Sequence, residues 1–260
     1  MACRIAICGK GGVGKSTFAA LAVRCLSEQR QRPVLAVDAD PNATLGAMLG
    51  VEVDASVADI REETLEKKDA IPSGMSKDQF VEFKIQQCIS EHKGFDLLTM
   101  GRPEGPGCYC FVNSLLRRYL ERVADDYPYV VIDNEAGMEH LSRRTDGAVD
   151  LMLIVTEPTV VGADTVQRIA ALARKLHITV KKKAVVLNRV PPAGVPEAIR
   201  ERIAAARLPI AGEIPVDAGI AEAAAAGRSL RELPADSPMF ASVCRILGQE
   251  VPGRTSVKRG

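Results

Sequence analysis

Residues 9–17, GKGGVGKST, combine glycines, lysines and hydroxyl side chains in a spacing that suits phosphate binding. The segment fits the pattern G-x-x-x-x-G-K-[ST]. Glycines let backbone N–H groups converge on phosphate oxygens without a Cβ in the way, and the N-terminus of a following helix adds partial positive charge. Lys15 is expected to reach the β- and γ-phosphates, and the Ser16 hydroxyl to bind Mg²⁺. A glycine-rich turn without a ligand is the weaker alternative, so the expected nucleotide contacts are Gly11, Gly12, Val13, Gly14, Lys15, Ser16 and Thr17.

Carboxylates follow two other apolar segments, where they could meet the phosphates and their magnesium ion. The segment VDADP contains Asp38 and Asp40, and VVIDNEAG contains Asp133 with Gly137 four residues later. Ligands of parallel sheets bind at the carboxyl ends of the strands, which is where these side chains fall. We expect Asp133 to hold Mg²⁺, directly or through a water, and Asp38 to have a structural role. An aspartate that only caps a turn is the competing interpretation.

Two cysteines with one residue between them, Cys108 and Cys110 in the segment GPGCYC, form a second set of reactive side chains. They precede a helix expected to begin near Phe111, and a helix N-terminus lowers the pKa of a thiol. A redox couple, two free cysteines and half of a metal site are all conceivable, although a disulfide within C-x-C would be strained. Two thiolates do not complete a tetrahedral site. The metal interpretation therefore predicts one soft divalent ion, such as Zn²⁺, shared by four cysteines across the two-fold axis of a homodimer.

The elements that would position these residues alternate between short apolar runs and longer amphipathic stretches. Most of the apolar runs lack polar alternation, which is typical of strands covered on both faces. Helical periodicity covers 15–29, 111–126, 163–176 and 196–206. This alternation predicts a single α/β domain with a mostly parallel, twisted sheet flanked by helices. Its strands are expected at 3–8, 33–38, 95–100, 129–133, 151–157, 182–188 and 209–215.

Composition places few further limits on the protein. The stretch 52–93 is charge-rich and is predicted to be a helical insertion in a domain spanning 1–250, with 251–260 as a basic, disordered tail. Lys+Arg is 34 and Asp+Glu is 33, and a net charge of +1 gives no indication of a nucleic-acid partner. No secretion signal or membrane-spanning run is recognised. Seven cysteines, an odd number, fit a reduced cytoplasmic protein.

The segments KGGVGKS, VDADPN, GRPEGPGCYCFVNSLLR and IDNEAGMEHLSRR together resemble the carbon monoxide dehydrogenase accessory ATPases of the CooC type. That family is similar to MinD, the nitrogenase iron protein and the arsenite-pump ATPase, whose deviant P-loops carry a lysine at the position of Lys10. The resemblance implies that Lys10 of one subunit reaches the phosphates bound by the other, and that Asp40 positions or activates the attacking water. It also implies adenine contacts from Asn188 and the backbone of Pro215, Val216 and Asp217. The sequence shows no N-K-x-D guanine signature, so ATP is expected rather than GTP.

The same resemblance implies a function in metal-centre assembly. ATP would drive dimerisation, Ni²⁺ or Zn²⁺ would bind between the two C-x-C loops, and nickel would be inserted into carbon monoxide dehydrogenase or acetyl-CoA synthase. ATP/ADP and Mg²⁺ would be the cofactors, and no stable membrane association is expected. An iron–sulfur carrier ATPase and a MinD-like positioning ATPase remain as alternatives. A reductase like the iron protein is disfavoured because the stretch 134–150 holds no cysteine.

Overall fold

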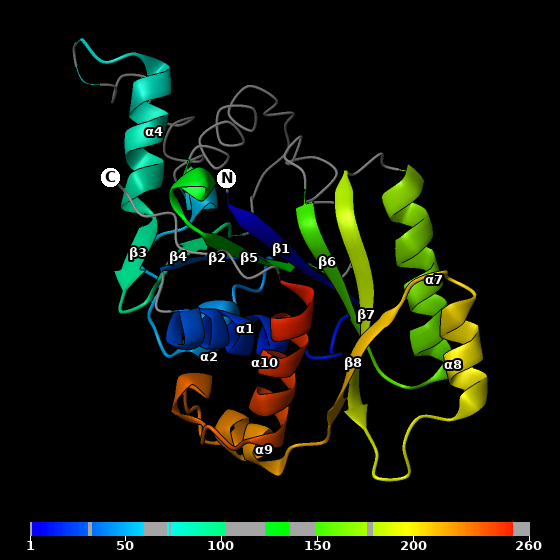
Figure 1. The fold of residues 1–260 in the computed structure, drawn as a ribbon. Helices are drawn as coiled ribbons and strands as arrows, with labels where there is room; N and C mark the ends of the chain where they lie inside the picture. Colours follow the sequence, from blue (N-terminus) through cyan, green and yellow to red (C-terminus); the bar gives the residue numbers. More distant parts are fainter. Residues whose placement is uncertain are drawn as a thin grey trace, which may run out of the picture.

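An eight-stranded sheet forms the centre of the computed structural model, which describes residues 2–30, 33–59, 72, 74–101, 123–135, 149–175 and 179–251 (Figure 1). The strand order is β3-β4-β2-β5-β1-β6-β7-β8. All neighbouring strands pair in parallel except β3 and β4, which are antiparallel. The strands are β1 (Cys3–Cys8), β2 (Val34–Ala39), β3 (Ile89–His92), β4 (Phe95–Thr99), β5 (Tyr129–Asn134), β6 (Val149–Thr156), β7 (Val180–Val190) and β8 (Ile210–Pro215).

Helices cover both faces of the sheet (Figure 1). One core cluster joins the sheet to α1, α2, α9, α10 and the short 3-10 helix η1. On the opposite face, a second cluster joins it to α7 and α8, and a third lies under α4. The bounds are α1 (Lys15–Arg30), α2 (Leu45–Leu49), α4 (Lys77–Gln87), α7 (Val160–Lys175), α8 (Glu197–Ala204), α9 (Ala218–Ala225), η1 (Leu230–Glu232) and α10 (Pro238–Glu250).

Strand β1 shows why its sequence lacks polar alternation. Ile5 and Ile7 are buried in the cluster beneath α1, whereas Ala6 and Cys8 are buried in the cluster beneath α7. Successive side chains of a strand point to opposite faces, and here both faces are covered. The expected single α/β domain with a mostly parallel sheet is confirmed. Each expected strand is present, with bounds that shift by at most a few residues.

The helical insertion predicted around 52–93 contains α4, but its C-terminal end forms a strand that was not predicted. Ser76 begins α4 with a capping box, but Ile89–His92 then forms β3 at the edge of the sheet. Gly94 adopts a φ of 90° and closes a tight hairpin to β4, a conformation that favours glycine. The sequence ISEH is short and polar, so it carries no strand-like apolar run.

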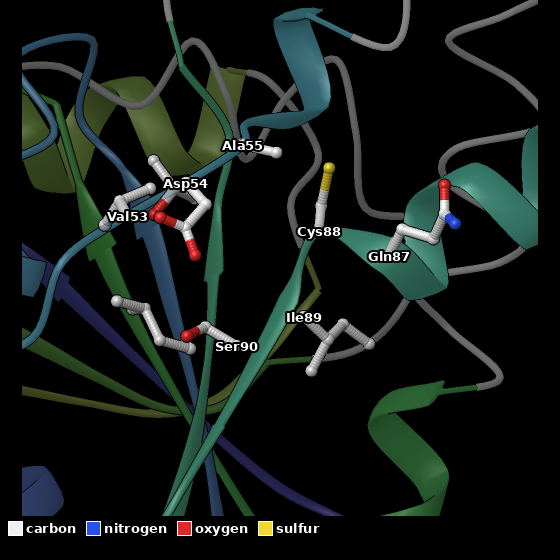
Figure 2. Close-up of a pocket in the computed structure, with 9 residues that line it drawn as sticks. Val53, Asp54, Ala55, Gln87, Cys88, Ile89 and Ser90 are labelled. Carbon is white, nitrogen blue, oxygen red and sulfur yellow. The ribbon is translucent and has the colours of Figure 1, made fainter.

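The hairpin of β3 and β4 faces the segment that follows α2. In Figure 2, Val53, Asp54 and Ala55 lie across from Cys88 and Ser90. Together with Leu97 and Thr99 of β4, these residues line a small cavity of about 110 Å³. It is separate from the glycine-rich turn after β1.

Other predicted segments agree with the structure or fall outside its described part. The predicted helices at 15–29, 163–176 and 196–206 correspond to α1, α7 and α8. The helix predicted at 111–126 lies outside the described residues except for its last four positions. Of the predicted tail 251–260, only Val251 is described.

The cysteines depart from the expectation that all of them are reduced. Cys25 of α1 and Cys244 of α10 form a disulfide, with their Cα atoms 5.7 Å apart. Among the described residues, Cys3, Cys8 and Cys88 are buried and take no part in a disulfide. The disulfide joins two helices that already pack against each other on one face of the sheet. No sequence pattern indicated this pair, because the two positions are separated by 219 residues.

Candidate functional site

The glycine-rich turn 9–14 connects β1 to α1 and brings its backbone close to two other strands. A Cβ at Gly9 would lie 2.3 Å from the carbonyl oxygen of Val155, and one at Gly14 would lie 2.5 Å from Asn188 Nδ2. Gly14 also has a φ of 92°. Glycine is therefore required at both positions for the turn to pack against β6 and β7.

Lys15 is the first residue of α1, and its side chain is almost entirely buried. Its Nζ donates a hydrogen bond to the carbonyl oxygen of Lys10 at 3.3 Å. The ammonium group is thus held beside the turn that it would help to bind to phosphate. Lys10 itself is exposed, which is compatible with a contact to a second subunit and does not test it.

The turn lines an open cavity of about 430 Å³ at the carboxyl end of the sheet. Gly11, Gly12, Gly14, Lys15, Ser16 and Thr17 form one wall. The remaining lining side chains come from other elements and are Asp40, Asn42, Thr44, Met48, Glu135 and Arg189. The cavity therefore brings the predicted nucleotide contacts of this turn, except Val13, together with Asp40, and their binding of a nucleotide stays a prediction.

Asp133, at the end of β5, is the unusual group beside this cavity. Its side chain is fully buried, and within the described part of the chain neither carboxylate oxygen has a partner at hydrogen-bonding distance. Burial raises the pKa of Asp133 from its ordinary value of 3.8 to about 7; nearby Ser16 and Lys15 lower it, and Asp38 raises it. A buried carboxylate without a partner is costly, and a cation with oxygen ligands removes that cost. The donor set therefore fits Mg²⁺, with Asp133 and the Ser16 hydroxyl as the protein groups that would hold it.

Asp38 has the structural role that the sequence analysis assigned to it. One carboxylate oxygen accepts from the N–H of Asp40 at 3.2 Å, and the other from the N–H of Leu45 at 2.8 Å. These bonds close the turn between β2 and α2. Burial raises the pKa of Asp38 to about 6, although the two backbone donors oppose that change.

Asp40 lies on the cavity, but one of its oxygens is engaged within its own turn. Oδ1 accepts from the backbone N–H of Asn42 at 2.9 Å and from its Nδ2 at 2.8 Å. Asp40 therefore caps a turn and lines the cavity at the same time. The two interpretations considered for this residue are compatible, and its action on water remains a prediction.

The predicted adenine contacts occupy structural positions in this conformation. Asn188 is buried, and its Nδ2 donates to the carbonyl oxygen of Val13 at 2.8 Å, which braces the glycine-rich turn. The carboxylate of Asp217 caps α9 through Gly219 and accepts from Ser237 Oγ at 2.7 Å. In the described residues, the lining of the large cavity does not include Asn188 or the segment 215–217.

Two charged residues of the cavity were missed by the sequence analysis. Glu135 follows Asp133 by two positions, and Arg189 follows Asn188 directly. Glu135 lies just beyond the end of β5, and its position after the predicted strand 129–133 was the only signal for it. No such signal existed for Arg189, because its orientation depends on a positive φ of 55°.

The predicted metal cysteines, Cys108 and Cys110, lie outside the described residues, as does Gly137. Within the described ranges, no cluster of three or more His, Cys, Asp or Glu residues could hold a metal ion. The same part of the chain contains no helix that is long and apolar enough to cross a membrane.

Residues 5–230 match the family model described as the CobQ/CobB/MinD/ParA nucleotide binding domain. The chain belongs to this family of P-loop ATPases. An uncharacterized ATP-binding protein of Methanocaldococcus jannaschii is 44% identical over 93% of this chain and 96% of its own length. The carbon monoxide dehydrogenase accessory protein CooC of Rhodospirillum rubrum is 34% identical over 88% of this chain and 90% of its own length.

Solved structures of the same family share the fold. MinD of Pyrococcus horikoshii, whose structure contains Mg-ADP, has a TM-score of 0.69 and 22% identity, with 96% of each chain covered. A ParA-family ATPase of Chlorobium tepidum has a TM-score of 0.69 and 21% identity, covering 94% of this chain and 96% of its own. These likenesses establish the architecture, whereas the family model and the sequence relatives establish the nucleotide-binding class.

Proposed function

We propose that this protein is an ATP-hydrolysing maturation factor for a nickel enzyme. It would dimerise on nucleotide, hold Ni²⁺ or Zn²⁺ between two C-x-C loops, and promote nickel insertion into carbon monoxide dehydrogenase or acetyl-CoA synthase. The observation that carries this proposal is the similarity to CooC, which extends over most of both chains. The segment containing Cys108 and Cys110 is part of the resemblance that the sequence itself carries.

The nucleotide half of the mechanism uses the groups around the large cavity. The backbone N–H groups of residues 11–16 and the ammonium of Lys15 would bind the phosphates. Asp133 and the Ser16 hydroxyl would hold Mg²⁺, which when bound neutralises the charge that develops on the phosphates. Asp40 would orient the attacking water, and Lys10 would reach the nucleotide of the partner subunit.

A hydrogen bond in the sheet supports communication between this site and the cysteine loop. The carbonyl oxygen of Asp38 accepts from the N–H of Met100 at 2.8 Å. The carboxylate of the same Asp38 closes the turn that carries Asp40. Gly101, directly after Met100, is the last described residue before the segment that contains Cys108 and Cys110. A rearrangement of the turn after hydrolysis would therefore act directly on the start of the cysteine loop.

The number of protein ligands that a metal ion needs would determine when the dimer binds it. Each chain supplies two thiolates, and a tetrahedral ion needs four ligands, so the closed dimer would hold the metal more tightly than the open one. Because binding linkage is reciprocal, metal should favour the dimer to the same extent. Opening after hydrolysis would halve the number of protein ligands and release the ion to the client enzyme.

The test is metal stoichiometry with and without a non-hydrolysable ATP analogue. The reduced protein is titrated with Ni²⁺ and Zn²⁺ while light scattering reports the mass. One ion per dimer is expected, and the double variant Cys108→Ser/Cys110→Ser should bind none while keeping ATP affinity. Cys88→Ser is the matched control, because Cys88 is a free buried cysteine. Tight binding by a strict monomer, or by the double variant, would contradict the shared site.

Functional assays separate the proposal from its alternatives. Nickel-free carbon monoxide dehydrogenase should gain activity faster with this protein, ATP and limiting Ni²⁺ than with Ni²⁺ alone. An iron–sulfur carrier would instead be brown and contain iron after anaerobic purification. A MinD-like positioning ATPase would sediment with anionic lipid vesicles in an ATP-dependent manner.

A further inference from the structure

Thr44 stands directly before α2, but its hydroxyl does not cap this helix. Threonine at such an N-cap position commonly accepts a hydrogen bond from an N–H of the first turn. Here the backbone of Thr44 is already helical, with φ −90° and ψ −16°, and its side chain makes no capping hydrogen bond to α2. Asp38 of β2 takes over this role, because its carboxylate accepts from the N–H of Leu45 at 2.8 Å. The Thr44 hydroxyl is therefore available for a different contact.

That contact is to the hydroxyl of Ser16, the second residue of α1. Thr44 Oγ1 donates to Ser16 Oγ at 3.3 Å, across 28 positions of the chain, and both residues line the nucleotide cavity. Ser16 also acts on the neighbouring carboxylate Asp133. A hydroxyl oxygen has two lone pairs, so Ser16 can accept from Thr44 and still offer a lone pair to a metal ion. The contact therefore fixes the Ser16 side chain without occupying the position that Mg²⁺ needs.

A second contact between the same two helices holds Thr44 in place. Met48 lies one turn after Thr44, so the two side chains share one face of α2. Thr17 Oγ1 donates to Met48 Sγ at 3.9 Å, and Met48 also lines the cavity. Two consecutive residues of α1, Ser16 and Thr17, are thus each matched by a residue of α2. This pair of contacts keeps the face of α2 that carries Thr44 against the first turn of α1.

We propose that Thr44 is a positioning residue whose hydroxyl holds Ser16 in the orientation that binds Mg²⁺, and thereby raises the affinity of the site for the ion. This rests on the nucleotide half of the proposed function, in which Ser16 and Asp133 hold Mg²⁺, and it is independent of the cysteine site. Removing an outer partner of a metal ligand lowers metal affinity. A hydroxyl that only stabilised the turn before α2 would change the free energy of unfolding and leave metal affinity unaltered.

The test measures metal affinity directly, with Mn²⁺ as the probe in place of Mg²⁺. Electron paramagnetic resonance distinguishes free from bound Mn²⁺ in the presence of a non-hydrolysable ATP analogue. Thr44→Val removes the hydroxyl at nearly the same volume and should weaken Mn²⁺ binding by about 3- to 30-fold. Binding of the analogue in EDTA, measured by calorimetry, should be unchanged because no metal takes part. Thr44→Ser keeps the hydroxyl and should retain the wild-type affinity for Mn²⁺.

Three controls separate positioning from folding. In the Ser16→Ala background, Thr44→Val should cause no further loss of Mn²⁺ affinity, because Thr44 acts through Ser16. Since Asp38 caps α2, Thr44→Val should leave urea stability close to that of the wild type. Thr165→Val is the matched control and should keep the wild-type Mn²⁺ affinity. The Thr165 hydroxyl donates to the carbonyl oxygen of Val161 within α7, a helix that contributes no described residue to the cavity lining.

Several outcomes would overturn the role of Thr44. They are wild-type Mn²⁺ affinity in Thr44→Val, an equal loss of affinity in Thr44→Ser, and a further loss in the Ser16→Ala background. Lower urea stability of Thr44→Val with unchanged affinity would assign the hydroxyl to folding alone. If the wild type bound the analogue equally well with and without metal, the Mg²⁺ site at Ser16 would be refuted together with this proposal. The Ni²⁺ and Zn²⁺ titration of the cysteine variants would still decide the metal-insertion function separately.

Discussion

Replacing the buried carboxylate Asp133 should make the protein more stable while removing its activity. Asp133 is fully buried and has no hydrogen-bond partner among the described residues, and its pKa is raised from 3.8 to about 7, mainly by burial. Holding the group ionised at pH 8 therefore costs about 3 pKa units, and each unit is worth about 1.4 kcal/mol, giving roughly 4 kcal/mol. Asp133→Asn removes this charge at nearly the same volume. Because the new amide is also buried, the expected gain in the free energy of unfolding is smaller, about 2 to 4 kcal/mol.

The sign of the pH dependence gives a second check on the same variant. The pKa of this carboxyl group is higher in the folded state than in the unfolded state, so its protonated form favours folding. This contribution to stability is complete below the unfolded pKa and is lost as the pH rises through the folded pKa. The Asp133 contribution should thus be lost between about pH 4 and pH 7. The advantage of Asp133→Asn should accordingly be large at pH 8 and shrink toward pH 4.

Urea unfolding of metal-free and nucleotide-free protein at pH 8 and pH 5 measures both effects. Asp150→Asn is the matched control, because Asp150 accepts from Arg4 N–H and Lys181 Nζ, and these partners lower its pKa. Its replacement should destabilise the protein at pH 8. If Asp133→Asn were less stable than wild type at pH 8, or if its advantage were the same at both pH values, the cost assigned to this carboxylate would be wrong.

Three further changes test the remaining groups of the nucleotide site. Lys15→Ala should abolish ATP binding or hydrolysis, because the buried ammonium lies on the turn; normal turnover would refute the site. Asp40→Asn should keep ATP binding and a trapped dimer but slow single-turnover hydrolysis at least tenfold, whereas an aspartate that only caps the Asn42 turn would leave the rate unchanged. Asn188→Ala should lower the free energy of unfolding by about 1 to 2 kcal/mol, because Val13 loses a buried hydrogen-bond donor. Unchanged urea stability would show that this brace contributes nothing.

Elements with a strong local signal could be predicted from the sequence. The strands at 3–8 and 129–133 are continuous apolar runs because both faces of the sheet are covered, and the glycine-rich turn has a fixed spacing. Asp38 and Asp133 followed from their positions at strand ends. These features depend on a few neighbouring residues, so no knowledge of distant contacts was needed.

Features that depend on distant contacts could not be predicted in this way. The edge strand Ile89–His92 is polar and exists because β4 offers it a partner. Arg189 reaches the cavity because the register between β7 and β8 shifts at this point, and no sequence pattern indicates such a shift. The engagement of Asn188 with Val13 joins residues 175 positions apart. For Cys108 and Cys110, coordination chemistry remains the basis of the prediction.

The link between Cys25 and Cys244 turns most of the polypeptide into a closed covalent ring. Every backbone position between these residues lies on that ring, so a single cut there would leave the two pieces attached until the disulfide is reduced. Closing a loop of this size restricts the unfolded chain by roughly 5 kcal/mol in the chain-entropy view. In a reducing compartment the ring would open, and packing alone would hold the C-terminal helix against the helix that begins at Lys15. Resistance to heat would then report the redox state of the surroundings.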